Sequence, residues 1–267
     1  MIKQFWLFFI VFLISGSNQA QNITATNLMD IFTIDSPQLH AIKKIWVYLP
    51  YNYKTTQKKY PVLYMHDAQN LFDDKTAYSG EWKVDEKLDS LKAELIVIGI
   101  EHGNDKRISE LTPYKNEKYG GGDADNYVDF IVHTLKPKID SMYRTKANRK
   151  NTLMMGSSLG GLVTLYSGLR YPDVFGKIAV FSPSLWFSKK IFEAVSFSKK
   201  TPEKLYLLCG DSEDEAMITD IDKLESILIT ERKIKSKNLK KVVIEKGQHN
   251  EKLWRDHFVD AILWLDY

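Results

Sequence analysis

The chain has 267 residues, of which 44% are hydrophobic and 12% aromatic, a composition that excludes a disordered or collagen-like protein and suits one sizeable core. Its 37 basic residues stand against 34 acidic ones, and a net charge of +3 does not predict a nucleic-acid partner. The single cysteine, Cys209, excludes an intrachain disulfide and a cysteine-rich zinc site.

The first 20 residues have the pattern of a secretory signal peptide. Lys3 precedes an apolar run at residues 5–14, and small and polar residues follow as far as Ala20. The run is shorter than the roughly 20 residues that span a bilayer. We therefore expect cleavage after Ala20 and no stable membrane span in the cleaved protein. The alternative is that the segment stays uncleaved as a membrane anchor. Export without a disulfide pair predicts a periplasmic or secreted bacterial protein whose residues 21–267 form a single domain.

Short apolar runs alternate with helical patterns along the rest of the chain. We expect strands at residues 45–49, 61–65, 95–100, 152–155, 178–181, 205–208 and 242–244, and helices at residues 124–142, 159–171, 220–233 and 251–264. This alternation predicts an α/β fold, with a mostly parallel sheet covered by helices on both faces. Two long polar segments, residues 67–80 and 103–125, are candidate functional loops.

Residues 156–160, Gly-Ser-Ser-Leu-Gly, match the pattern G-x-S-x-G between an expected strand and an expected helix. That context is the one in which a nucleophile elbow occurs, so Ser158 is the predicted nucleophile. We expect glycine at 156 and 160 because a Cβ atom at either position would clash with the neighbouring strand or helix. The backbone amide of Leu159, at the start of the helix, is then one donor for a developing oxyanion.

A general base is sought after Ser158, since the chain order in this kind of site is serine, acid, histidine. Only His249 and His257 follow Ser158. His249 lies in the loop after the expected strand 242–244, at the edge of the sheet where active sites form. His257 lies within the expected last helix, where a structural role suits it better. We therefore predict His249 as the base.

The acid partner is expected after the strand at residues 205–208. Asp211, Glu213, Asp214 and Glu215 all lie there, and spacing alone does not choose among them. Asp214 could instead cap the helix that follows.

The second oxyanion donor is expected in the loop after the strand at residues 61–65. A backbone amide of Ala68, Gln69 or Asn70 could serve. We expect His66 to anchor this loop by hydrogen bonds rather than to react.

Several stretches of the chain together resemble one family. They are residues 60–73, 135–140, 143–145, 156–161, 171–176, 182–186 and 247–251, with Trp254. The chain resembles the "putative esterase" family of α/β-hydrolases over about residues 40–265. This family includes esterase D, ferric-enterobactin esterases, feruloyl and acetyl-xylan esterases, and mycolyltransferases. Ala68 departs from the family pattern, because glycine is usual at that position.

The resemblance implies an α/β-hydrolase fold and a serine esterase without a cofactor or a metal. It implies Ser158 as the nucleophile, His249 as the base and Glu213 as the acid, although many members have aspartate there. It places Gln69 near the oxyanion hole and Trp186 beside the substrate pocket, where we also expect Asn70. The expected substrates are small-molecule or carbohydrate esters, including siderophore esters. An acyltransferase that uses the same triad and a non-catalytic binding protein are the alternatives.

Other residues carry weaker signals. Trp82 and Trp186 could each be a platform for a sugar or aryl group, or part of the core. Arg107 and Glu110 could pair with each other. The basic cluster at residues 232–241 is expected to be a solvated surface. No group of histidines and carboxylates has the spacing of a metal site.

Overall fold

The structure is a computed structural model that describes residues 29–267. The expected signal peptide at residues 1–20 lies outside the described residues. No helix within residues 29–267 is both long enough and apolar enough to cross a membrane.

The described residues form eight strands and eight α-helices. The strands are β1 (Met29–Ser36), β2 (Ala41–Tyr48), β3 (Val62–His66), β4 (Ile96–Ile100), β5 (Thr152–Ser157), β6 (Lys177–Phe181), β7 (Lys204–Gly210) and β8 (Leu239–Ile244). The helices are α1 (Val84–Leu91), α2 (Arg107–Leu111), α3 (Ala124–Phe130), α4 (Lys136–Met142), α5 (Leu159–Arg170), α6 (Lys190–Phe197), α7 (Met217–Thr230) and α8 (Glu251–Leu265).

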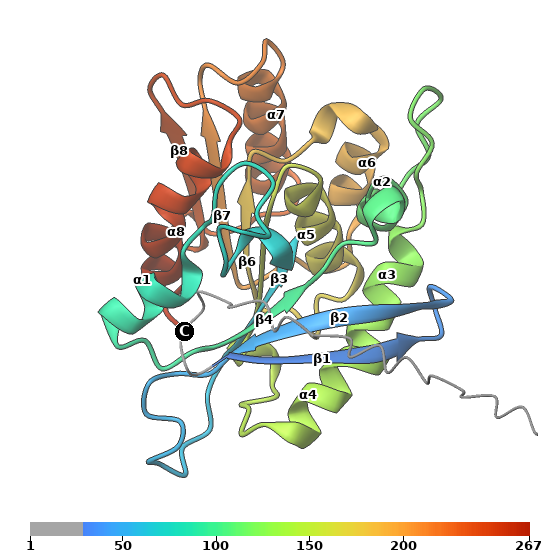
Figure 1. Ribbon diagram of the computed structural model, residues 1–267. Helices are drawn as coiled ribbons and strands as arrows, with labels where there is room; N and C mark the ends of the chain where they lie inside the picture. Colours follow the sequence, from blue (N-terminus) through green and yellow to red (C-terminus); the bar gives the residue numbers. More distant parts are fainter. Residues whose placement is uncertain (1–28) are drawn as a thin grey trace, which may run out of the picture.

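All the strands belong to one sheet in the order β1-β2-β4-β3-β5-β6-β7-β8 (Figure 1). β1 pairs antiparallel with β2, and β2 pairs antiparallel with β4. Every pairing from β4 through β3, β5, β6 and β7 to β8 is parallel. The expected mostly parallel sheet is therefore confirmed, and the loops after its parallel strands reach the same edge.

Helices cover both faces of the sheet, as the strand patterns predicted. Successive residues of a strand point to opposite faces, so Val62 and Tyr64 of β3 pack with α3, α5, α6 and α7 on one face. Leu63 and Met65 pack with α1 and α8 on the other face. Figure 1 shows α1 and α8 on one side of the sheet and α3, α5 and α6 on the other. Burial on both faces explains why the central strands are continuous apolar runs.

The helix expected at residues 124–142 is present, but its middle turn is wider than an α-helix. Residues Ile131–Leu135 form a π-helical segment, η3, between α3 and α4. Pro137 follows it in the first turn of α4. Because proline has no N–H to donate and its ring crowds the preceding turn, a local departure from α-helical bonding accommodates it here.

Three features differ from the sequence-based expectation: one additional strand and the starts of two elements. The hairpin partner β1 was not expected, and β2 begins at Ala41 rather than at residue 45. The helix expected at residues 220–233 begins at Met217, because the Asp214 carboxylate accepts hydrogen bonds from the N–H groups of Ala216 (2.7 Å) and Met217 (2.8 Å). The N-cap position itself is occupied by Ala216, so Asp214 binds the first amides of α7 from two residues upstream rather than as the N-cap residue.

Asn250 caps α8, the helix that directly follows the loop bearing His249. The Asn250 side chain accepts a hydrogen bond from the N–H of Leu253 at 3.0 Å. We expect Asn250→Ala to lower the free energy of unfolding by about 1 kcal/mol, because one N-terminal amide of the helix loses its acceptor. Urea unfolding measures this loss. Asn250→Ser should retain most of the stability, and an equal loss in both variants would contradict the capping role.

Candidate active site

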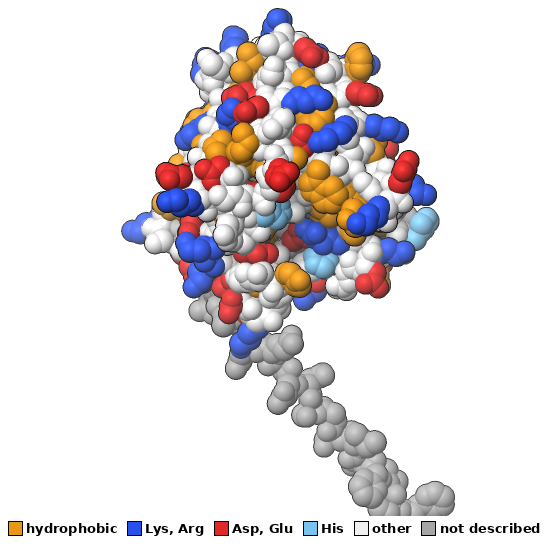
Figure 2. Space-filling model, turned by 90° about the horizontal axis from the view of Figure 1, so that it is seen from above, with side chains coloured by type: hydrophobic (Ala, Val, Ile, Leu, Met, Phe, Trp, Pro, Cys, Tyr) orange, Lys and Arg blue, Asp and Glu red, His pale blue; other side chains and the backbone are white. Residues whose placement is uncertain are grey.

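The side chains singled out in the sequence meet at the edge where the parallel strands end. Ser158 follows β5, Ser182 and Ser184 follow β6, Glu213 follows β7, and His249 follows β8. Figure 2 views the molecule from above and shows histidine side chains beside hydrophobic and basic ones near the middle of this face. The topology thus brings together residues that are up to 91 positions apart in the chain.

Ser158 lies in the single-residue turn that joins β5 to α5. Its backbone has φ 57° and ψ −124°, a conformation that non-glycine residues rarely adopt. The turn is held by a hydrogen bond from the Ser158 N–H to the carbonyl of Phe181 at 3.0 Å. The strained turn raises the Ser158 hydroxyl above the end of the sheet, as a nucleophile elbow requires.

The two glycines of the elbow differ in how closely they are packed. A Cβ atom at Gly156 would lie 2.5 Å from the carbonyl oxygen of Gly160, so only glycine fits there. A Cβ atom at Gly160 would lie 3.4 Å from its nearest neighbours in His66 and Asp67, which is a tight contact rather than a clash. The expected clash is therefore present at Gly156 and absent at Gly160, because the loop after β3 leaves slightly more room.

Ser158, His249 and Glu213 form a continuous chain of hydrogen bonds. The Ser158 Oγ atom is 2.9 Å from His249 Nε2, and His249 Nδ1 is 2.7 Å from Glu213 Oε2. The His249 side chain is 34% exposed, whereas that of Glu213 is fully buried. A buried carboxylate beside one imidazole nitrogen favours the tautomer that carries its proton on that nitrogen. The other nitrogen can then accept a proton from a hydroxyl.

The buried Glu213 carboxylate has further hydrogen-bond donors besides His249. Its Oε1 atom accepts from the Ser182 hydroxyl and from the Gly210 N–H, each at 2.6 Å. The Ser182 hydroxyl in turn accepts from the Trp254 indole N–H at 2.8 Å. The Trp254 ring also meets the His249 ring edge-on, with centroids 5.0 Å apart. The carboxylate is thus held in place by groups from β6, β7 and α8.

The other residues considered as acid or base have structural partners instead. Asp211 accepts hydrogen bonds from the N–H of Lys246 (2.7 Å) and the hydroxyl of Ser212 (2.9 Å). His257, on α8, lies 3.3 Å from the Asp260 carboxylate. Of the carboxylates after β7, Glu213 is the one within hydrogen-bond distance of His249.

The loop after β3 folds into a short 3-10 turn, η1 (Ala68–Asn70), beside the elbow. The N–H of Asn70 donates to the carbonyl of Asp67 at 2.9 Å. Three backbone amides were considered as oxyanion donors, and the amide of Asn70 is therefore already engaged. The amides of Ala68 and Gln69 lie at the start of the turn and have no acceptor within the turn. The Gln69 side chain accepts from the N–H of His102 at 3.4 Å, and the Asn70 side chain accepts from the N–H of Tyr78 at 3.0 Å.

His66 ends β3 and is buried beneath this loop. Its Nδ1 atom is 2.8 Å from the Tyr127 hydroxyl, and its Nε2 atom has no hydrogen-bond partner among the described residues. Burial lowers the pKa of His66 to about 4, so the imidazole is neutral near pH 7. The contact with Tyr127 of α3 agrees with the anchoring role expected for His66.

Arg107 and Glu110 do not pair with each other, which corrects the expectation from their spacing. Arg107 binds the carboxylate of Asp67 through Nε at 2.7 Å and through the terminal nitrogen Nη2 at 2.8 Å. Glu110 pairs with Lys43 of β2 at 2.8 Å. Residues three apart on α2 face different neighbours, and both neighbours are distant in sequence, so spacing could not identify them.

The two tryptophans considered as substrate platforms have different environments. Trp82 is only 3% exposed and stacks on Phe181 with ring centroids 5.8 Å apart, so it belongs to the core. Trp186 is 45% exposed and meets the ring of Tyr119 edge-on at 5.7 Å. It follows Ser184, whose hydroxyl lies 3.3 Å from that of Ser158. Trp186, on the segment after Ser184, and Tyr119, in the loop between α2 and α3, thus form an exposed aromatic pair.

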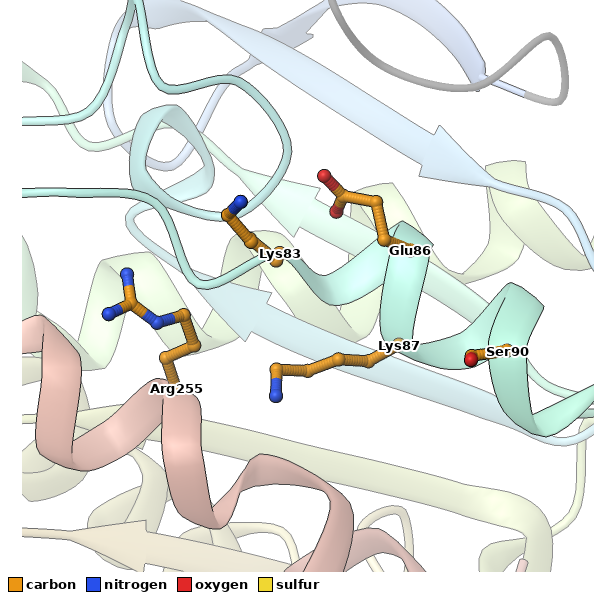
Figure 3. A pocket seen from close by; sticks show the side chains of 5 residues that line it. All are labelled: Lys83, Glu86, Lys87, Ser90 and Arg255. Carbon is orange, nitrogen blue, oxygen red and sulfur yellow. The ribbon is translucent and has the colours of Figure 1, made fainter.

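A surface cavity of about 510 Å³ lies away from these residues, between α1 and α8 (Figure 3). It is lined by Lys83, Glu86, Lys87, Ser90 and Arg255. The predicted nucleophile and base therefore lie outside this cavity.

Three carboxylates gather near the start of α1, a cluster that sequence spacing did not reveal. Oxygen atoms of Glu81, Asp85 and Glu86 lie within 4.8 Å of one another. Burial, with the neighbouring acids, raises the pKa of Glu81 to about 7. The positive end of the α1 dipole favours carboxylates at this position.

Comparison with known proteins gives a family match over nearly all the described residues. A family model described as "Putative esterase" matches residues 36–265. The ferri-bacillibactin esterase BesA of Bacillus subtilis is 30% identical over 176 residues, which cover 58% of this chain and 60% of that protein. An endo-1,4-beta-xylanase/feruloyl esterase of Xylanibacter ruminicola is 28% identical over 178 residues, which cover 63% of this chain but only 22% of that longer protein.

The fold is also similar to that of solved structures. A crystal structure of BES protein from Bacillus cereus superposes with a TM-score of 0.73 at 20% sequence identity, covering 91% of this chain and 96% of that one. At this level of identity the match demonstrates the shared fold, which is the α/β-hydrolase-like fold that the family resemblance implied.

Proposed function

We propose that this chain, which belongs to the putative esterase family and hydrolyses carboxylic esters, is a serine esterase. Its proposed triad is Ser158, His249 and Glu213. The observation that carries the proposal is the pair of hydrogen bonds, 2.9 Å from Ser158 to His249 and 2.7 Å from His249 to Glu213. These distances allow proton transfer before any substrate binds.

In the proposed acylation step, His249 Nε2 removes the proton from Ser158 as Oγ attacks the ester carbonyl carbon. The carbonyl oxygen becomes an oxyanion that accepts hydrogen bonds from the backbone amide of Leu159 and from an amide of the η1 turn, for which Gln69 is our choice. The tetrahedral intermediate then loses its alcohol. The bond to the alkoxide oxygen breaks, and the imidazolium of His249 protonates that oxygen.

In the proposed deacylation step, water takes the place of the alcohol. His249 removes a proton from the water as it attacks the acyl-Ser158 carbonyl, and a second tetrahedral intermediate forms in the same oxyanion hole. The collapse of this intermediate releases the carboxylic acid and returns the proton to Ser158. Glu213 accepts a hydrogen bond from His249 Nδ1 and stabilises the positive imidazolium, which its burial and fixed position make effective.

We propose esters whose acyl portion bears an aromatic ring, as in siderophores or feruloylated carbohydrates, as the substrate class. The support is the exposed Trp186–Tyr119 pair beyond Ser184 and the names of the siderophore and feruloyl esterase relatives. We further propose that a single domain, residues 21–267, acts outside the cytoplasm after export. That part rests on the sequence pattern of residues 1–20.

The nucleophile can be tested by replacing Ser158 with alanine. We expect hydrolysis of p-nitrophenyl acetate to fall by at least about 10³-fold, because no other group can form the acyl-enzyme. A fluorophosphonate probe should label the parent and not Ser158→Ala. Ser184→Ala, whose hydroxyl lies 3.3 Å away, is the matched control and should still be labelled. Unchanged hydrolysis in Ser158→Ala would overturn the assignment, and an unlabelled parent would favour a non-catalytic binding protein.

The acid can be tested by comparing three variants in the same loop. We expect Glu213→Gln to lower kcat by about 10²–10⁴-fold, because the neutral amide no longer stabilises the imidazolium and can hold the wrong tautomer. Asp211→Asn and Asp214→Asn should change kcat by less than about threefold, since their carboxylates bind backbone amides. A larger loss in either control than in Glu213→Gln would reassign the acid.

The aromatic pair can be tested with two substrates of different acyl group. For methyl ferulate we expect Trp186→Ala to raise KM about tenfold, because one aromatic contact with the acyl ring is lost. For p-nitrophenyl acetate KM should change by less than about twofold. Phe197→Ala, which removes an aromatic ring that is 83% exposed at the end of α6, is the control. Equal effects on both substrates would argue against a role in acyl recognition.

Hydrolysis and acyl transfer differ only in the molecule that attacks the acyl-enzyme. Product analysis with an added acceptor alcohol distinguishes them, and we expect the free acid to remain the main product. A predominant new ester would identify an acyltransferase with the same triad.

A further inference from the structure

Asp67 occupies the first position of the loop that is to provide an oxyanion donor. It follows β3 directly and adopts the left-handed conformation, φ 55° and ψ 49°, with only 7% of its surface exposed. Its carbonyl accepts the N–H of Asn70 and so closes the η1 turn. The orientation of the Ala68 and Gln69 amides therefore depends on how Asp67 is held.

The Asp67 carboxylate also lies close to the other oxyanion donor. Its Oδ2 atom is 3.4 Å from the point where a Cβ atom of Gly160 would stand, in the first turn of α5. The amide proposed to bind the oxyanion belongs to Leu159, the residue before. An unneutralised carboxylate beside the first turn of α5 would repel the negative charge proposed to develop near the Leu159 amide, and burial would strengthen the repulsion.

Arg107 supplies the opposite charge from a segment 40 residues downstream. Its Nε and Nη2 atoms bind the two carboxylate oxygens of Asp67 at 2.7 and 2.8 Å. Burial by itself would raise the pKa of Asp67, but the hydrogen bonds and charge of Arg107 outweigh burial and lower it. Both members of the pair are therefore ionised at neutral pH, and their charges largely cancel.

A second buried ion pair fixes the helix that carries Arg107. Glu110 of α2 is 3% exposed and binds Lys43 of β2 at 2.8 Å and the N–H of Gly103 at 3.0 Å. The guanidinium is thus held on a helix that is anchored to the sheet.

We propose that Arg107 is a positioning residue of the esterase, which neutralises Asp67 beside the oxyanion and thereby keeps the loop at residues 67–70 effective in catalysis. The inference rests on the proposed function, because it assumes that the oxyanion forms between the Leu159 amide and this loop. Arg107 acts through Asp67 and does not itself contact the substrate.

The test removes the Arg107 charge first and then the charges of Arg107 and Asp67 together. In Arg107→Met the Asp67 carboxylate is left without its counter-charge, and we expect kcat for p-nitrophenyl acetate to fall by about 10²-fold with KM changed by less than about twofold. In the double variant Arg107→Met/Asp67→Asn no charge is left uncompensated, and kcat should recover about tenfold relative to Arg107→Met. Recovery of kcat on removal of a second charge is a result that a merely structural role for Arg107 does not produce.

A charge-conserving variant keeps the proposal testable if Arg107→Met does not fold. Arg107→Lys retains the positive charge, and we expect its kcat to stay within about tenfold of the parent. Arg170→Met is the matched control, because Arg170 pairs with Asp125 and Asp129 at the far end of α5. It should leave kcat within about twofold. Circular dichroism and thermal unfolding of each variant report whether it is folded.

Each other outcome overturns the proposal. An unchanged kcat in Arg107→Met, a double variant no faster than Arg107→Met, or a kcat in folded Arg107→Lys as low as that of the methionine variant would exclude charge neutralisation. A rise in KM alone would identify Arg107 as a substrate contact instead. Failure of the proposed function is distinguishable, because it would appear as unchanged hydrolysis in Ser158→Ala, whatever the Arg107 variants do.

Discussion

The site depends on how tightly β5 turns into α5. The turn is made by one residue, Ser158, and its positive φ is imposed by the strand on one side and the helix on the other. This tight turn is possible only because residue 156 is glycine. The carbonyl oxygen of Gly160 lies 2.5 Å from the position that a Cβ atom of residue 156 would occupy. The same turn aims the hydroxyl at His249 and leaves the first amides of α5 free of intrahelical acceptors. Backbone geometry thus places the proposed nucleophile and one proposed oxyanion donor together.

Glu213, the proposed acid, is held by a second set of interactions, which reaches across the sheet. Glu213 is fully buried, and its hydrogen bonds come from Ser182 after β6, Gly210 of β7 and His249 after β8. A buried carboxylate needs such partners, because an unpaired charge away from water is costly. Trp254 extends the network to α8 through Ser182. The relative positions of these strands therefore control the acid and the base jointly.

Local patterns predicted much of this arrangement, and the remainder depends on contacts between distant segments. Ser158 could be identified because the G-x-S-x-G pattern falls between a strand and a helix, and His249 because it follows the last apolar run. The pairing of Arg107 with Asp67, 40 residues away, has no local signal. The choice of Glu213 over Asp211 depends on which carboxylate the turn after β7 directs inward. The position of β1 reflects its pairing with β2, since an edge strand has few buried residues to mark it.

The exposure of His249 has a consequence for turnover. About a third of its side chain faces solvent, although the carboxylate behind it is sealed from water. In the proposed mechanism, a water molecule can therefore reach the imidazole directly, and the alcohol displaced from Ser158 can depart into bulk solvent. On this proposal, branched or polymer-linked esters lie across such a rim with most of their length in solution, so the bulk of the alcohol portion places little limit on the reaction.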